Sequence, residues 1–210
     1  MERFVIAMTR KCGSGATTIS KMLAQHYGID LYDRKLLQLA SEDSGINEAL
    51  FANADERVKS SLLYRACKKV YSGELIPPES NDFTSNDNLF NYQAKVLKEL
   101  AERESYIVIG RGADFILKDY KNLISIFLYA DENQCMRHQM DQLCCDEKEA
   151  LRYIKKINKY RSGYYKYHTG QSWENPNNYD LCIHTGKLTY EQTVDLIKEY
   201  VAKRIEKKEG

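Results

Sequence analysis

The architecture of the chain follows from one stretch near its amino end, Arg3-Phe4-Val5-Ile6-Ala7-Met8-Thr9-Arg10-Lys11-Cys12-Gly13-Ser14-Gly15-Ala16-Thr17-Thr18. Residues 3–9 are mostly apolar and nearly continuous, which favours a strand buried on both faces of a parallel sheet. Residues 10–15 contain two glycines and predict a tight loop. From Ala16 to Tyr27 apolar residues recur at helical spacing, and Gly28 is a typical helix end. The sequence therefore predicts a strand, a glycine-rich loop and a helix.

The same alternation continues along the chain. Further apolar runs predict strands at 106–110, 123–129 and 179–184, and a shorter one at 29–32. Helical patterns lie between them, at about 90–104, 132–143, 147–168 and 189–206. In the last helix, Thr189 and Gln192 fit a capping box. Alternating strands and helices predict one α/β domain over residues 1–210, with a parallel sheet and right-handed crossovers.

Two regions interrupt this alternation. Residues 33–95 are polar and mostly helical in pattern, with a loop predicted over 75–88. Residues 144–178 are basic and aromatic. Either region suits an insertion that covers a site at the carboxyl ends of the strands, where open α/β sheets bind ligands. The alternative is that both are plain surface helices.

Composition narrows the class of protein. The chain has 210 residues, 31 basic and 30 acidic side chains and a net charge of +1, which argues against a general nucleic-acid binder. Its longest apolar run, residues 123–130, is too short to span a membrane, and no secretory signal is visible. The six cysteines form no Cys-x-x-Cys pair and no zinc-ligand spacing. We therefore expect a cytoplasmic protein with reduced thiols and no membrane or nucleic-acid partner.

The glycine-rich loop has the features of a phosphate-binding turn. Between a buried strand and a helix, successive amides point into the loop and the helix start adds partial positive charge. Gly13 and Gly15 let the backbone approach an anion closely. Thr17 stands where a hydroxyl would hold Mg²⁺, with Thr18 beside it. The alternative is an ordinary strand-to-helix turn.

The loop departs from the usual phosphate-binding pattern, G-x-x-x-x-G-K-[ST], at two positions. Arg10 replaces the first glycine and Ala16 replaces the lysine, whereas Gly15 and Thr17 match. The lysine normally neutralises the β- and γ-phosphates, so its loss removes a stabilising charge. We hypothesise that Arg10 or Lys11 restores this charge from the other side of the loop.

Two short polar segments that follow predicted strands offer further candidates. After the strand at 106–110, the planar guanidinium of Arg111 suits a phosphate or a carboxylate. Asp114 could orient Arg111 or bind a metal or a hydroxyl, and the alternative is a structural Arg–Asp pair. In the segment 32–34, Asp33 is either a carboxylate of an acceptor site or the cap of a helix over 34–41.

Basic and aromatic residues alternate over 158–173. This mixture is typical of a surface for single-stranded nucleic acid, and it also suits a lid that closes over a polyphosphate. Arg161 is the strongest candidate for a phosphate-neutralising arginine, followed by Arg137. The alternative is a solvated helix whose tyrosines pack partly on the sheet.

In this order, the motifs resemble the cytidylate kinase-like family, which are P-loop relatives of the nucleoside monophosphate kinases. The resemblance covers nearly the whole chain and is carried by residues 10–15, 32–34, 108–114, 161–173 and 178–181. It implies a P-loop NTPase fold of the α/β class: a five-stranded parallel sheet, order 2-3-1-4-5, flanked by helices. It also implies a helical acceptor-binding insertion at 33–95 and a lid region at 144–178.

The resemblance further implies phosphoryl transfer from ATP and Mg²⁺ to a nucleoside monophosphate, with CMP or dCMP as the first expectation. By resemblance, the ATP phosphates would be held by Arg10, Lys11, Cys12, Gly13, Ser14, Gly15, Ala16, Thr17 and Thr18, and Thr17 would also hold the metal. The acceptor would be bound by Asp33, Arg34, Arg111 and Asp114. The catalytic arginines would be Arg111, Arg161 and Arg137.

The chain departs from the strict cytidylate kinases at three positions. Ala16 replaces the lysine, Asn158 stands where the lid of those relatives usually has an aspartate, and Met140 stands where a second arginine is expected. A non-catalytic nucleotide- or phosphate-binding module is therefore a second hypothesis, and a nucleic-acid-binding protein is a third. The sequence leaves open the acceptor and whether the protein is a homo-oligomer.

Overall fold

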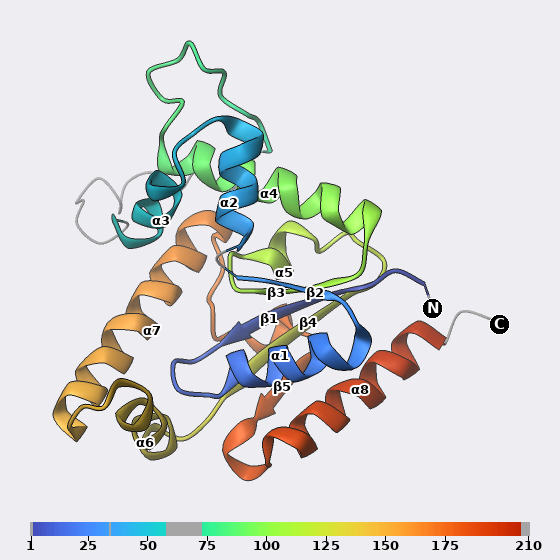
Figure 1. The fold of residues 1–210 in the computed structure, drawn as a ribbon, viewed down its shortest axis with the longest axis vertical. Helices are drawn as coiled ribbons and strands as arrows, with labels where there is room; N and C mark the ends of the chain where they lie inside the picture. Colours follow the sequence, from blue (N-terminus) through green and yellow to red (C-terminus); the bar gives the residue numbers. More distant parts are fainter. Residues whose placement is uncertain (1, 34, 58–72, 207–210) are drawn as a thin grey trace.

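The computed structural model describes residues 2–33, 35–57 and 73–206 (Figure 1). The strands are β1 (Val5–Arg10), β2 (Asp30–Tyr32), β3 (Tyr106–Ile109), β4 (Leu123–Tyr129) and β5 (Leu181–His184). The α-helices are α1 (Ala16–Tyr27), α2 (Lys35–Ser44), α3 (Glu48–Arg57), α4 (Asn86–Arg103), α5 (Ala113–Ile116), α6 (Glu132–Leu143), α7 (Glu147–Thr169) and α8 (Tyr190–Glu206). Two short 3-10 turns, η2 (Pro176–Asn178) and η3 (Thr185–Lys187), flank β5.

The five strands form one parallel sheet in the order β2-β3-β1-β4-β5, which confirms the expected topology. β1 lies at the centre, with Val5 opposite Tyr106 of β3 and Leu123 of β4. Because all strands run the same way, the loops after β1, β3 and β4 meet at one edge of the sheet.

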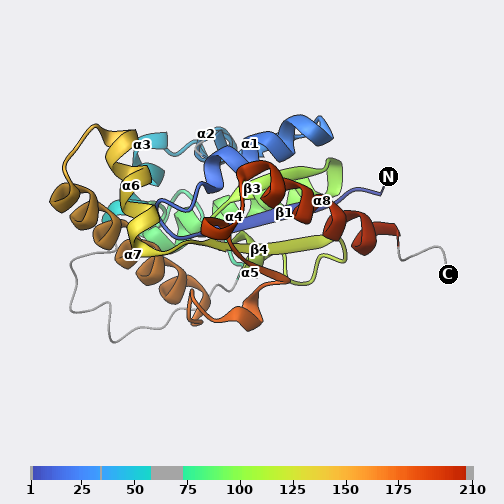
Figure 2. The same ribbon diagram turned by 90° about the horizontal axis from the view of Figure 1, so that it is seen from below.

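Helices cover both faces of the sheet, and the alternation of side chains along β1 divides the core in two. Ile6 and Met8 pack with α1 and α8, which lie together over one face (Figure 2). Val5 and Ala7 pack in a second cluster, to which α2, α4, α5 and α7 contribute. A strand with two buried faces explains the continuous apolar run at residues 4–8.

The predicted elements are confirmed, with shifted ends. The helix predicted from 90 begins at Asn86, because the Ser85 side chain accepts from the Asn88 amide and so caps it earlier. The strand predicted from 179 begins at Leu181, because Asp180 turns aside to bind the Ser125 amide and hydroxyl.

The capping box at the start of α8 is confirmed. The Thr189 amide donates to Gln192 Oε1 at 2.9 Å, and the Gln192 amide donates to Thr189 Oγ1 at 3.2 Å.

Among the described residues, no helix is both long enough and apolar enough to span a bilayer.

Candidate active site

The loop that joins β1 to α1, residues 10–15, is called here the glycine loop. Gly13 and Gly15 have left-handed backbones, with φ of 83° and 76°. A Cβ on Gly13 would lie 2.6 Å from the Cys135 carbonyl oxygen in α6, and a Cβ on Gly15 would lie 2.5 Å from the Tyr190 ring in α8. Both backbone conformation and close packing therefore require glycine at these positions.

The glycine loop and the first turn of α1 present amides that are open to an anion. Within the described residues, no acceptor receives the main-chain N–H groups of Gly13, Gly15, Ala16, Thr17 and Thr18. A helix start always leaves four such groups, and Gly13 adds a fifth. The first turn of α1 contains no acidic residue and no side-chain cap, so its partial positive charge is not neutralised there. This arrangement fits a phosphate group.

The start of α1 also contains a residue that could hold a metal ion. Thr17 and Thr18 are exposed, whereas Ala16 is buried. Among the described residues there is no group of three or more acidic, histidine or cysteine side chains that would hold a metal. The Thr17 hydroxyl fits Mg²⁺, because Mg²⁺ beside nucleotide phosphates takes few protein ligands and keeps several waters.

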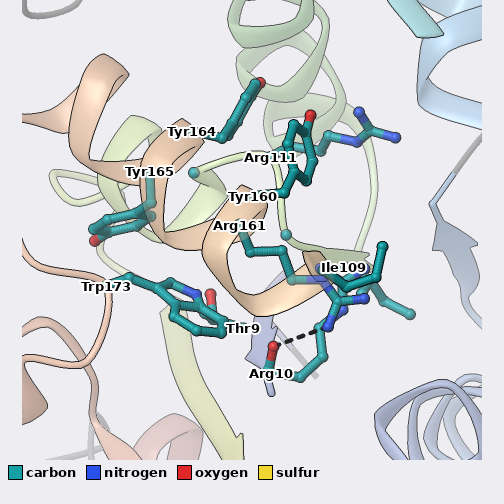
Figure 3. A pocket seen from close by; sticks show the side chains of 12 residues that line it. Thr9, Arg10, Ile109, Arg111, Tyr160, Arg161, Tyr164, Tyr165 and Trp173 are labelled. Atoms are coloured by element: carbon teal, nitrogen blue, oxygen red, sulfur yellow. Dashed lines mark hydrogen bonds between the residues drawn. The ribbon is translucent and has the colours of Figure 1, made fainter. Parts of the chain in front are cut away.

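A cavity of about 200 Å³ lies beside the glycine loop, at the carboxyl ends of β1 and β3 and under α7 (Figure 3). Three of its lining side chains are arginines, and we call it the arginine cavity: Arg10, Arg111 and Arg161. Four aromatic side chains complete much of its wall: Tyr160, Tyr164, Tyr165 and Trp173. Its combination of cations and rings suits a ligand with an anionic group attached to a flat ring.

Arg10 connects the glycine loop to the arginine cavity. Its main chain ends β1, and its guanidinium lies against Gly110, where a Cβ would collide with it. Burial, helped by the charges of Arg161 and Arg111, lowers the pKa of Arg10 to about 9, and the Asp33 carboxylate partly opposes them. Arg10 stays charged at neutral pH, and an anion in the cavity would relieve this unfavourable environment.

Arg111 has an uncommon backbone conformation. Its φ is 64°, between Gly110 at 75° and Gly112 at 65°. A left-handed conformation costs a residue with a Cβ about 1–2 kcal/mol, and such strain often occurs at functional sites. The sharp turn sets Arg111 at the edge of the cavity, directly after β3.

Arg161 projects from α7 into the same cavity. Its Nη1 donates to the Arg10 carbonyl oxygen at 3.2 Å. Burial lowers the pKa of Arg161, while the Asp33 carboxylate acts in the opposite direction. The half-buried Asp33 carboxylate thus acts on both Arg10 and Arg161.

Asp114 lies behind the cavity wall. It is 4% exposed, and its Oδ2 accepts from the Tyr165 hydroxyl at 2.6 Å. Burial raises the pKa of Asp114 to about 6, although the hydrogen bond from Tyr165 acts against it. The structure therefore places Asp114 where it orients Tyr165, which itself lines the cavity.

Other predicted residues lie away from the cavity or outside the described residues. Lys11 pairs with Glu174 at 2.9 Å, so the structure favours Arg10 over Lys11 as the cation that compensates for Ala16. Arg137 is exposed on α6 and does not line the cavity. Arg34 lies outside the described residues, so the helix predicted over 34–41 is described only as α2 from Lys35.

The aromatic wall of the cavity was not predicted from the sequence. Ile157, Tyr160, Arg161, Tyr164 and Tyr165 recur at helical spacing and form the face of α7 that points into it. That spacing was the available signal. Tyr164, Tyr165 and Trp173 are buried, so these rings do not form an open stacking surface for nucleic acid.

A parallel sheet in this order, with an open glycine-rich loop after its central strand, defines a P-loop NTPase fold of the kinase type. The model of the cytidylate kinase-like family matches residues 5–187. The chain belongs to the cytidylate kinase-like family. No curated protein sequence matches it.

Solved structures give the same fold. An uncharacterized protein from Eubacterium ventriosum is 28% identical, with 95% of this chain and 98% of that chain covered and a TM-score of 0.69. A shikimate kinase from Bacteroides thetaiotaomicron is 14% identical, with 94% and 98% covered and a TM-score of 0.52. A gluconokinase from Sinorhizobium meliloti is 13% identical, with 96% and 94% covered and a TM-score of 0.52.

Proposed function

We propose that this protein transfers a phosphoryl group from ATP to a nucleoside monophosphate, with CMP or dCMP as the first acceptors to test. The observation that carries the proposal is the contact between two anion-binding features. The glycine loop offers open amides, the arginine cavity offers three guanidinium groups, and Arg10 belongs to both.

Phosphoryl transfer needs little covalent help from a protein, because positioning and charge neutralisation supply most of the catalysis. In the proposed reaction, the amides of Gly13 and of the start of α1 bind the donor phosphates. Arg111 holds the acceptor phosphate, and Arg10 and Arg161 neutralise the charge between donor and acceptor. The acceptor oxygen belongs to a phosphate, so no strong general base is required.

Mg²⁺ would be held by the Thr17 hydroxyl and by the nucleotide phosphates, and it would neutralise their charge when bound. Residues 147–169 form α7, which covers the arginine cavity. We propose that α7 acts as the lid and that the region 33–95 contributes to the acceptor site. A closed lid would exclude water and so limit hydrolysis of ATP.

The choice of acceptor rests on charge. The two kinases compared above are named for shikimate and gluconate, so the fold alone does not select an acceptor. Three arginines around one small cavity favour a dianionic phosphate over a single carboxylate. The aromatic wall suits the base of a nucleotide.

Ala16 favours a second candidate function, a nucleotide-binding module without catalysis. It is buried and brings no charge to the donor phosphates. A coupled assay with ATP, Mg²⁺ and a panel of nucleoside monophosphates separates the two functions. Turnover with at least one monophosphate supports the kinase. Binding of ADP without turnover of any acceptor supports the binding module.

A further inference from the structure

The first half of the glycine loop is held by α7 and by the segment that follows it. Asn158 Oδ1 accepts from the Cys12 amide at 2.8 Å, and Arg161 Nη1 donates to the Arg10 carbonyl at 3.2 Å. Lys11 pairs with Glu174 at 2.9 Å. Each residue from 10 to 12 is thus held by a partner from the region 158–174.

The three contacts differ in strength. The side chains of Lys11 and Glu174 are 34% and 58% exposed, and an ion pair in such surroundings contributes little. The bond from the Cys12 amide to Asn158 is partly buried, and Cys12 itself is 5% exposed. Without its acceptor, this amide would be left unsatisfied in the protein.

The contact at Asn158 lies between the two anion-binding features. Cys12 leads directly into Gly13, whose open amide begins the phosphate cradle, so the position of Cys12 sets the direction of that amide. On α7, Ile157, Tyr160 and Arg161 flank Asn158 and line the arginine cavity. Asn158 therefore links α7 directly to the glycine loop.

We propose that Asn158 is a positioning residue that sets the shape of the glycine loop and couples it to the arginine cavity. The inference rests on the proposed function, because it assumes that the loop binds the donor phosphates. The carboxamide oxygen of Asn158 accepts the hydrogen bond from the Cys12 amide. An aspartate at this position would therefore keep the bond, and a leucine of similar size would lose it.

Trp173 provides a reporter for this coupling. It is the chain's single tryptophan, is 4% exposed and lines the arginine cavity, but it is absent from the glycine loop. If Asn158 couples the two features, ADP with Mg²⁺ bound at the loop will change the emission of Trp173. A merely structural role of Asn158 would not link ADP binding at the glycine loop to the emission of Trp173.

The experiment compares wild type, Asn158→Leu and Asn158→Asp, with Lys159→Ala as a control at the exposed neighbouring position. Calorimetry gives the Kd of ADP with Mg²⁺, and fluorescence gives the response of Trp173. For Asn158→Leu we expect ADP to bind about three- to tenfold more weakly, because one hydrogen bond is lost. We also expect little change in Trp173 emission when ADP is saturating. Asn158→Asp and Lys159→Ala retain both signals.

Hydrogen exchange of the Cys12 amide shows directly whether each variant keeps the bond, and it identifies any variant that has unfolded. Unchanged affinity and unchanged Trp173 response in a folded Asn158→Leu protein would overturn the inference and leave the proposed function intact. Loss of both signals in Asn158→Asp, with the Cys12 amide still protected, would also overturn it. Failure of the wild type to bind ADP would reject the proposed function and the inference together.

Discussion

Arg10 occupies the position of the first glycine in the usual phosphate-binding pattern, and its side chain lines the arginine cavity instead of the phosphate cradle. Gly110 makes this possible, because any Cβ there would collide with the guanidinium. We propose that Arg10 replaces, from the acceptor side, the positive charge lost at Ala16. Arg10 would then act on both the donor and the acceptor phosphates.

Substitution of Arg10 tests this role. Arg10→Gly restores the usual glycine and should lower kcat/KM about 10- to 100-fold, because a charge-assisted contact contributes roughly 1.5–3 kcal/mol. Arg10→Lys keeps the charge but loses the planar guanidinium, so its kcat/KM should lie between those of wild type and Arg10→Gly. Lys11→Ala is the matched control, with a small effect expected from an exposed pair. Steady-state kinetics with ATP and CMP measures all four proteins, and equal kcat/KM for wild type and Arg10→Gly contradicts the role.

Arg111 combines backbone strain with a site position. Arg111→Gly should stabilise the protein relative to Arg111→Ala by about 1 kcal/mol, because glycine adopts a φ of 64° without penalty. Both variants lose the guanidinium and should lose most of the activity. Urea denaturation gives the free energy of unfolding. Equal stabilities of the alanine and glycine variants would show that the backbone is not strained.

At the scale of elements, the Asp114–Tyr165 hydrogen bond joins α5 to α7. The pKa of Asp114 is about 6 in the folded protein, above its unfolded value of about 3.9. The folded state therefore binds more protons between these values, and the contribution of Asp114 to stability is lost as pH rises from about 4 to about 6.

Asp114→Asn provides the comparison, since its carboxamide oxygen can still accept from Tyr165. The difference in unfolding free energy between wild type and Asp114→Asn should change by about 2–3 kcal/mol across that pH range, in favour of the variant at higher pH. Urea denaturation at several pH values measures it. A difference that does not depend on pH would mean that Asp114 titrates normally.

The elements themselves were predictable from the sequence because their apolar periods are regular. β1 and β4 are buried on both faces and read as continuous apolar runs, and α1 follows a helical stripe. The glycine loop was predictable from its place between β1 and α1. The direction of a long side chain was not, because Arg10 turns toward Gly110, a residue 100 positions away.

Contacts between distant segments set the rest of the site. The bond from the Cys12 amide to Asn158 joins two residues whose sequence surroundings show no relation. The position of Asp114 behind Tyr165 likewise depends on how α5 packs against α7. Sequence patterns report burial and period, whereas these contacts depend on tertiary packing.

At the scale of the whole molecule, ligands should stabilise the folded protein by occupying the two anion-binding features. ADP with Mg²⁺ at 100 times its Kd should add about 2.7 kcal/mol and raise Tm by roughly 5–10 °C. CMP or dCMP should also raise Tm, whereas shikimate and gluconate should not, because one carboxylate does not balance three arginines. Thermal denaturation with each compound tests this. An equal rise with gluconate would contradict the phosphate selectivity.

We propose that main-chain amides of the glycine loop and of the start of α1 bind the donor phosphates although the usual lysine is missing. The most direct measurement is a titration of ¹⁵N-labelled protein with ADP and Mg²⁺, followed through the amide resonances of Gly13, Gly15, Ala16, Thr17 and Thr18. We expect these five resonances to shift together and to saturate with one Kd that matches the Kd from calorimetry. If ADP binds while these resonances stay in place, or if it does not bind, the claim is wrong.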